Sequence, residues 1–369
     1  VSICENSAKK SRGKFMDYRE CLERLAASGH IEQKNGLQIH VKPVPETDCP
    51  GVVDPRAANW FRNLPKGYQV QDYRRITSEE VQILRDAMGC RNADLSRGVK
   101  TNRRTINTEN GDVPILIYTP DISGTLPLIC YIHGGGFFGG STEVVENACR
   151  LLAERAKSVV ISIDYGLAPE HRFPEGLLQC WGVIRWVHSH AELLNIDPQR
   201  IAVSGDSAGG NLSMACCLLD NEGIIRAQLL LYPAIVLRSD IDFGWTWDVY
   251  EMNEGKDAAL MMVHDIKDTV GRIIWMYIRD ITDTYSQLLS PWQAPAFAKF
   301  PPTFLAVGEY DYLRQEAELF CQRLVKTGIP VAFFRYQGMG HAFFEHTGEF
   351  PQAEDCTNKM AEFLSSIWS

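Results

Sequence analysis

The sequence predicts an α/β fold, in which a mostly parallel central sheet is flanked by helices. Two observations carry this prediction. The apolar runs 127–132, 201–203, 303–307 and 331–336 have the character of buried strands, and each leads into a loop that contains glycine. The second run is followed within a few residues by a helix-like stretch at 211–219. Strands that alternate with helices build a sheet with helices on its faces.

The loop after the second run carries the sequence Gly-Asp-Ser-Ala-Gly at 205–209, which is a G-x-S-x-G pattern. In this pattern a serine sits on a tight turn between a strand and a helix, where glycines avoid the clashes that side chains would cause. A serine hydroxyl exposed on such a turn becomes a nucleophile when a histidine accepts its proton. Ser207 is therefore the candidate nucleophile, and the alternative is a glycine-rich turn without a catalytic role.

A nucleophilic serine needs a base and a carboxylate that orients the base, in the chain order Ser, then Asp or Glu, then His. The acid is expected after the third apolar run, where Asp311 is our candidate and Glu309 the alternative. The base is expected after the fourth run, where a glycine-containing loop leads to His341. His346 is the alternative base, although it lies beyond this loop in what resembles the next helix.

Donors for an oxyanion are expected in the loop after the first run, which reads His-Gly-Gly-Gly-Phe at 133–137. Glycines let the backbone approach a substrate carbonyl closely enough for its N–H groups to point at the developing charge. The rival interpretation is a phosphate-binding loop, but no Gly-Lys-Ser/Thr sequence follows. The expected oxyanion residues are Gly134, Gly135, Gly136 and Ala208.

Together these motifs resemble the hormone-sensitive-lipase-like branch of the α/β-hydrolase esterases, over about residues 100 to 365. The resemblance rests on the glycine loop, on Gly-Asp-Ser-Ala-Gly-Gly at 205–210, on Met-Gly-His-Ala-Phe at 339–343 and on the stretch 164–174. It implies an α/β-hydrolase fold and an N-terminal segment that caps the active site. It also implies a catalytic triad of Ser207, Asp311 and His341.

The stretch 164–174 departs from the family pattern at two positions. Gly166 stands where the family usually has arginine, and Arg172 stands where it usually has proline. We expect the first change to alter loop packing rather than chemistry. Glu170 and His171 lie in the same stretch, and we expect them to form a hydrogen-bonded brace, with a second acid/base pair as the alternative.

Residues 1–100 precede the catalytic domain, 101–369, and we expect a cap or lead-in segment, with plain scaffold as the alternative role of its helices. A first helix of this segment is indicated by four apolar residues at helical spacing, Phe15, Tyr18, Leu22 and Leu25. It is expected to stop at Gly29. A second helix is expected after Thr77, with Glu80 as its capping-box partner.

The segment from about 239 to 293 is too long for a simple connection between two strands, and it is rich in methionine and aromatic residues. Such residues usually form a core. Because this segment is expected to lie over the active site as a second part of the cap, we expect some of them to line an apolar pocket. The candidate substrate-binding residues are Phe137, Asp206, Trp245, Trp247, Met261, Met262 and Trp275.

Composition excludes several classes of protein. A formal net charge of −9 argues against nucleic-acid binding, which needs a basic surface. The sequence has no run of about 20 apolar residues, so we expect no membrane span. The eleven cysteines show neither a CxxC pair nor a zinc-ligand spacing, so neither disulfides nor a metal are indicated. Reduced cysteines and a start without signal-peptide features favour a cytoplasmic protein, although a leader removed before Val1 is an open alternative.

The sequence as a whole predicts a serine hydrolase that cleaves carboxylic esters with a short acyl chain or a bulky hydrophobic alcohol. It would act through an acyl-enzyme on Ser207, without a metal or an organic cofactor. The expected partner is a small hydrophobic ester, and we allow for a homodimer. One alternative is a non-hydrolytic acyl transferase, lyase or cyclase of secondary metabolism. Another is a small-molecule receptor of the gibberellin-receptor type, which lacks the catalytic histidine.

Overall fold

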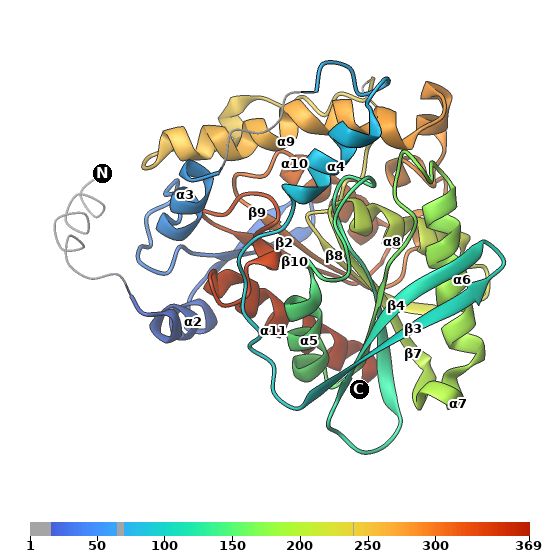
Figure 1. The fold of residues 1–369 in the computed structure, drawn as a ribbon. Coiled ribbons are helices and arrows are strands. Elements are labelled where there is room, and N and C mark those ends of the chain that lie inside the picture. Colours follow the sequence, from blue (N-terminus) through green and yellow to red (C-terminus); the bar gives the residue numbers. More distant parts are fainter. Residues whose placement is uncertain (1–15, 65–69, 239) are drawn as a thin grey trace.

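The computed structural model describes residues 16–64, 70–238 and 240–369, and its centre is a ten-stranded sheet (Figure 1). The strands are β1 (His30–Lys34), β2 (Leu37–Lys42), β3 (Val99–Thr108), β4 (Gly111–Pro120), β5 (Leu126–Ile132), β6 (Val159–Ile163), β7 (Ile196–Asp206), β8 (Ile225–Leu231), β9 (Thr303–Gly308) and β10 (Val331–Tyr336). Their order across the sheet is β1-β2-β10-β9-β8-β7-β5-β6-β4-β3. From β2 to β6 neighbouring strands are parallel, and the pairs at both edges are antiparallel.

The expected strands are confirmed as β5, β7, β9 and β10. Every residue of β5, β6 and β9 is buried. Continuous apolar runs of this kind are typical of parallel strands that are covered on both faces. These strands therefore form the core of the molecule, and the loops at their carboxyl ends can present functional side chains.

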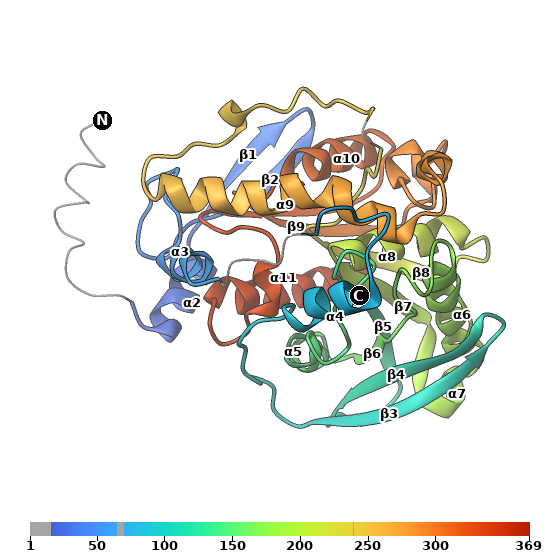
Figure 2. The same ribbon diagram turned by 45° about the horizontal axis from the view of Figure 1, so that its top comes forward.

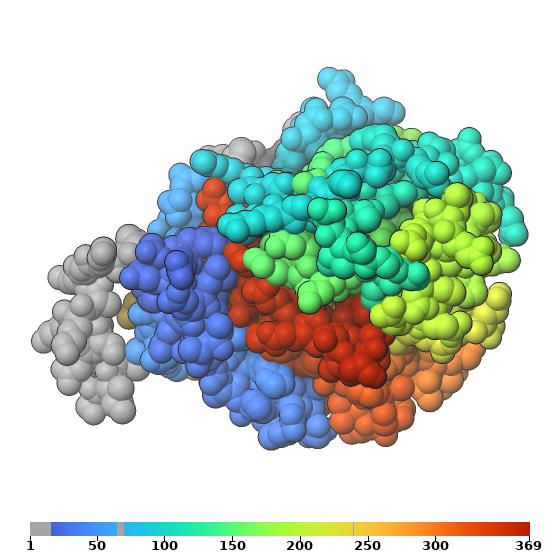
Figure 3. Space-filling view, turned by 90° about the horizontal axis from the view of Figure 1, so that it is seen from below, coloured from blue at the N-terminus to red at the C-terminus, as the bar shows by residue number. Residues whose placement is uncertain are grey.

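Helices cover both faces of the sheet. Figure 3 shows one face, where α11 (Pro351–Trp368) lies between α2 (Tyr18–Ala27) and α5 (Glu146–Ala156). Elsewhere α6 (Glu175–Ser189) and α8 (Ala208–Leu219) pack together. The short helix α7 (Ala191–Leu194) leads into β7, and α10 (Arg314–Lys326) packs against β9, β10 and β2.

Not all of residues 1–100 lie in a cap, because β1 and β2 belong to the central sheet. β2 pairs in parallel with β10, with Ile39 opposite Phe333. Leu37, Ile39 and Val41 alternate along β2 and are buried, so the pairing places an apolar row in the core. The helix α2 ends at Ala27, close to the predicted stop, and the predicted contribution of Phe15 lies outside the described residues.

Other parts of the N-terminal segment lie at one end of the sheet, as a cap would. They are α3 (Pro55–Arg62) and α4 (Ser78–Asp86), and they lie near α9 (Lys256–Tyr277) from the long insertion (Figures 1 and 2). Thr77 and Glu80 form the predicted capping box of α4. Helix α3 packs directly on α9. No helix in the described ranges has the length and apolar character needed to cross a membrane.

Candidate active site

Ser207 lies on the turn between β7 and α8, with φ of 51° and ψ of −115°. A positive φ is uncommon for a residue other than glycine, and such strain is concentrated at functional sites. A Cβ atom on Gly205 would lie 2.4 Å from the carbonyl oxygen of Gly209. A Cβ atom on Gly209 would lie 1.9 Å from the carbonyl oxygen of Ile132. Glycine at both positions is therefore a requirement of this turn.

The structure brings Ser207, His341 and Asp311 together from three separate loops. The Oγ atom of Ser207 is 2.9 Å from Nε2 of His341. Nδ1 of the same imidazole is 2.7 Å from Oδ2 of Asp311. With Nδ1 donating to the carboxylate, Nε2 is left as the acceptor for the serine proton. This is the geometry of a nucleophile, a base and an orienting carboxylate.

The charge state of His341 reflects two opposing influences. Burial lowers its pKa, because an imidazolium loses solvation there. The Asp311 carboxylate opposes this through its charge and its hydrogen bond, with smaller contributions from Asp265 and Asp206, and the net pKa lies above the ordinary value. An imidazolium formed during a reaction would thus be stabilised in place.

The Asp311 loop is held by its own hydrogen bonds. Oδ1 of Asp311 accepts from the N–H of Leu313 at 2.8 Å, and its carbonyl oxygen accepts from the Tyr250 hydroxyl at 3.0 Å. That hydroxyl also accepts from Nε1 of Trp245 at 3.2 Å. The aromatic residues of the insertion therefore support the acid loop. Sequence reasoning did not find this role, because the partner lies 61 residues away in the chain.

The two alternative candidates occupy other positions. Oε2 of Glu309 accepts from the N–H of Gly338 at 3.0 Å and so braces the loop that carries His341. Burial raises the pKa of Glu309. His346 stacks on Phe350, and burial lowers its pKa to about 4. Neither residue makes a hydrogen bond to the Ser207–His341 pair within the described structure.

The glycine loop that follows β5 is fixed to the serine turn by Asp206. Oδ1 of Asp206 accepts from the N–H of Gly134 at 3.0 Å and from the Tyr131 hydroxyl at 2.9 Å. A Cβ atom on Gly134 would lie 2.2 Å from the other carboxylate oxygen. Burial raises the pKa of Asp206 to about 6, against the lowering effect of these two donors. Asp206 is thus a buried brace that also lines the cavity, and its predicted contact with substrate stays a prediction.

This arrangement also corrects the expected set of oxyanion donors. The N–H of Gly134 is already used by Asp206, so it cannot serve an oxyanion as well. The N–H groups of Gly135 and Gly136 meet no backbone acceptor in the described structure, and Ala208 is the first residue of α8, where an N–H has no intrahelical acceptor. Three N–H groups therefore remain available beside Ser207.

The cap is attached to this loop by Arg85 of α4. Its guanidinium donates to the carbonyl oxygens of Phe138 at 2.7 Å and Ala168 at 2.9 Å. It also pairs with Glu170 at 2.7 Å, which lowers the pKa of that carboxyl. His171 contacts Glu175 at 3.2 Å. In the structure, Glu170 and His171 thus form the brace that we expected, away from the Ser207–His341 pair.

A cavity of about 1270 Å³ opens above Ser207 and His341. One wall comes from α4 and the chain around it, including Tyr73, Leu84 and Met88, and another comes from α9. Phe137 lines this cavity as predicted and stacks on Tyr277 with ring centroids 4.1 Å apart. No cluster of His, Cys, Asp or Glu suited to a metal occurs in the described ranges.

Most of the predicted pocket residues from the insertion lie outside this cavity. Met261 lines it, but Met262, one position further along α9, is fully buried and lies against Gly340 in the loop of His341. Trp275 is covered by the guanidinium of Arg74. Trp245 and Trp247 pack edge to face with each other. The prediction failed because clustering in sequence does not say which face of a helix points at the site.

Comparison with known proteins identifies the family of this chain. A family model described as the alpha/beta hydrolase fold matches residues 129–345. An arylesterase of Saccharolobus solfataricus is 32% identical over 302 residues, covering 79% of this chain and 92% of the relative. The carboxylesterase NlhH of Mycobacterium tuberculosis is 30% identical over 269 residues, covering 71% and 81%.

Solved structures of esterases are also similar to this protein in fold. The hyperthermophilic esterase of the archaeon Pyrobaculum calidifontis superimposes with a TM-score of 0.73 at 26% identity, covering 86% of this chain and 99% of that one. The protein has the α/β-hydrolase fold. Within that superfamily, the chain belongs to the hormone-sensitive-lipase-like family of carboxylesterases.

Proposed function

We propose that this protein hydrolyses carboxylic esters, with Ser207 as the nucleophile, His341 as the general base and Asp311 as the residue that orients His341. The observation that carries the proposal is the pair of short contacts, 2.9 Å from Ser207 to His341 and 2.7 Å from His341 to Asp311, at the floor of a large cavity. The printed activities of the relatives, arylesterase and carboxylesterase, support the same reaction class.

The reaction would proceed in two halves. Oγ of Ser207 attacks the ester carbonyl while Nε2 of His341 takes its proton, and the oxyanion accepts hydrogen bonds from Gly135, Gly136 and Ala208. The tetrahedral intermediate then collapses, His341 gives the proton to the departing alkoxide, and an acyl-enzyme remains. In the second half water attacks the acyl carbon with His341 as base, and the carboxylic acid leaves.

The cavity supports an ester with a hydrophobic part. Ligand pockets typically measure about 300–1,000 Å³, and this one is larger at about 1270 Å³. Leu64, Ile83 and Met261 line it and are at the same time among the exposed large apolar residues of the surface. We propose a short acyl chain or a bulky hydrophobic alcohol as the preferred substrate. Buried cysteines of the core with free thiols, such as Cys130, Cys180 and Cys216, support a cytoplasmic location, and a homodimer stays a prediction.

The test is the Ser207→Ala variant, assayed with p-nitrophenyl acetate and butyrate and with a fluorophosphonate probe. The variant should lose hydrolysis and labelling while its far-UV circular dichroism and melting temperature stay close to those of the wild type. Because the acyl-enzyme forms on Ser207, both losses should be near complete. Labelling of the variant at wild-type rate would place the nucleophile elsewhere.

A further inference from the structure

The helix α9 crosses the proposed active site in a defined direction. Near its start, Met262 lies against the loop of His341, since a Cβ atom on Gly340 would be 3.1 Å from it. Near its end, Ile273 lies against the glycine loop, since a Cβ atom on Gly136 would be 2.6 Å from its Cδ1 atom. The first half of the cavity-facing side of α9 therefore lies on the His341 side, and the second half lies on the oxyanion side.

The mechanism places the two parts of an ester on different sides of Ser207. His341 must reach the departing oxygen to protonate it, so the alcohol part leaves on the His341 side. The alcohol part should then lie under the first half of α9. Side chains there, rather than those above the glycine loop, contact the alcohol and set the preference for it.

Asp265 is the charged residue of α9 in that position. It lines the cavity, and no side chain in the described parts of the molecule hydrogen-bonds to its carboxylate or forms an ion pair with it. Asp265 is an exposed residue of the cavity lining, and it is near enough to His341 for the two charges to affect each other's pKa. Partial desolvation raises the pKa of Asp265. The neighbouring carboxylate of Asp268 differs, because it contacts Nδ1 of His264 at 3.3 Å.

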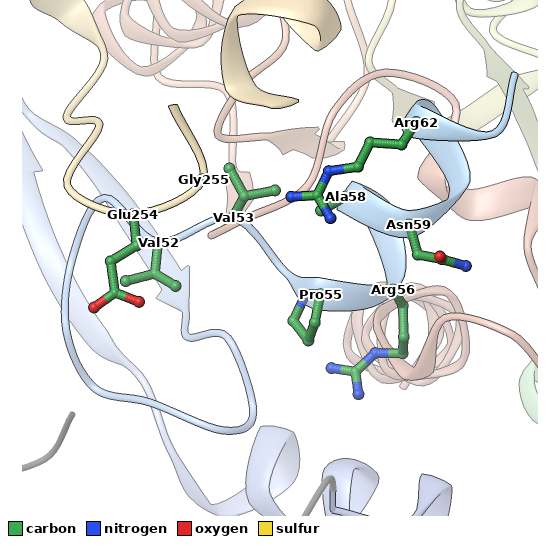
Figure 4. Close-up of a pocket in the computed structure, with 9 residues that line it drawn as sticks. All are labelled: Val52, Val53, Pro55, Arg56, Ala58, Asn59, Arg62, Glu254 and Gly255. Atoms are coloured by element: carbon green, nitrogen blue, oxygen red, sulfur yellow. The ribbon is translucent and has the colours of Figure 1, made fainter. Parts of the chain in front are cut away.

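The basic residues of the cavity do not neutralise this carboxylate. Arg272 lies seven positions further along α9, which is about 10 Å along the helix axis. Arg62, at the end of α3, extends toward Val53 and Gly255, where a second cavity of about 500 Å³ lies between α3 and the start of α9 (Figure 4). Neither guanidinium is within ion-pair distance of Asp265.

We propose that Asp265 is a specificity-determining residue that selects esters whose alcohol part carries a positive charge, such as an ammonium alcohol. This inference rests on the proposed ester hydrolysis. An unpaired carboxylate in a partly enclosed cavity favours a cation over a neutral group of the same shape. The ring of Trp60 lines the same cavity and contacts His346, five residues after His341, and aromatic faces attract ammonium groups.

The test compares two esters that differ only in charge, acetylcholine and 3,3-dimethylbutyl acetate, in which carbon replaces the quaternary nitrogen. The measured quantity is the ratio of their kcat/KM values at pH 8 and low ionic strength, about four units above the ordinary aspartate pKa. Wild-type enzyme should favour acetylcholine, and Asp265→Asn should reduce this preference about tenfold, with little change for the neutral ester. Any effect of the substitution on His341 cancels in the ratio, because both esters use the same base.

Asp257→Asn is the matched control, since it removes the same charge from the exposed first turn of α9, outside the cavity, and should leave the ratio unchanged. Added salt should weaken the preference of the wild type, which tests the proposal without a variant. A wild-type ratio near one, or a ratio that Asp265→Asn does not alter, overturns the proposal while ester hydrolysis stands. If neither these esters nor p-nitrophenyl acetate are cleaved, the proposed function fails and this inference fails with it.

Discussion

Asp311 and Glu309 lie two residues apart near the proposed active site, and their carboxylates contact different groups. Only Asp311 contacts the imidazole of His341, and Glu309 braces the backbone at Gly338. We predict that Asp311→Asn lowers kcat about 10⁴-fold with a small change in KM, the size seen when a serine protease loses this carboxylate charge. Steady-state kinetics with p-nitrophenyl acetate measure both constants. Glu309→Gln is the comparison variant. If Glu309→Gln lowered kcat about 10⁴-fold and Asp311→Asn left it unchanged, Glu309 rather than Asp311 would be the residue that orients His341.

The pH profile should report the raised pKa of His341. The imidazole must be neutral to accept the serine proton, so activity is absent below its pKa and rises as pH passes through it. Because neighbouring carboxylates, Asp311 first, hold this pKa above the ordinary value of about 6.5, the rise in kcat/KM should be centred above that pH. Stopped-flow or plate assays between pH 5 and pH 9 measure it. A midpoint well below 6.5 would mean that burial outweighs the carboxylates.

The glycine loop after β5 needs a backbone conformation and a close approach that a residue with a side chain could not adopt. Gly135 has φ of +111°, and a Cβ atom there would lie 2.2 Å from the carbonyl oxygen of Gly139. We predict that Gly135→Ala displaces the proposed oxyanion donors and lowers kcat about 10²–10³-fold, with KM for short esters changed much less. Kinetics with p-nitrophenyl acetate measure the two constants separately.

Gly124→Ala provides the control for that variant. Gly124 also has a positive φ, of +101°, but a Cβ atom there meets nothing within 4 Å. The same kind of backbone strain is therefore introduced far from the proposed site, and kcat should stay near the wild-type value. Equal losses of kcat in both variants would trace the effect to general destabilisation rather than to the oxyanion.

At the scale of the whole molecule, the sequence predicted the central strands and the loops that bring Ser207, Asp311 and His341 together, but it did not predict the strands at one edge of the sheet. Ser207, Asp311 and His341 could be singled out because each lies within five residues of the end of a core strand, and the strand ends of a parallel sheet meet at one edge. The strands β1 and β2 were missed because they are short and polar on one face, so only their pairing with β10 identifies them.

The pocket residues of the insertion were also hard to predict from local sequence. The sequence shows that the insertion is rich in aromatic residues, but which side chains face the cavity depends on how α9 is rotated about its axis over the sheet. That rotation is set by tertiary contacts, such as Met262 against Gly340 and Ile273 against Gly136. The polar residue Asp265 therefore faces the cavity, while Trp245 supports the acid loop through Tyr250.

A buried ion pair joins β2 to the helix α11, and the last prediction rests on it. Nζ of Lys42, at the end of β2, lies 3.3 Å from Oδ1 of Asp355 in α11, and both side chains are less than 10% exposed. It also donates to the carbonyl oxygen of Leu25 in α2. Lys42→Met would leave a buried carboxylate without its cation, and among the described residues only the Tyr336 hydroxyl would still donate to it. Removing one partner of a buried pair typically costs about 3–5 kcal/mol in free energy of unfolding.

Because β2 is part of the central sheet and not of a separate cap, we expect this loss to appear in a single cooperative transition. Urea unfolding followed by circular dichroism and by residual esterase activity should give the same lowered midpoint for Lys42→Met. Lys359→Met is the control, since Lys359 pairs with the exposed Glu362 one turn away on α11 and should change stability by less than about 1 kcal/mol. If the Lys42 variant instead kept the wild-type midpoint by both probes, the N-terminal strands would be an appendage that the sheet does not need.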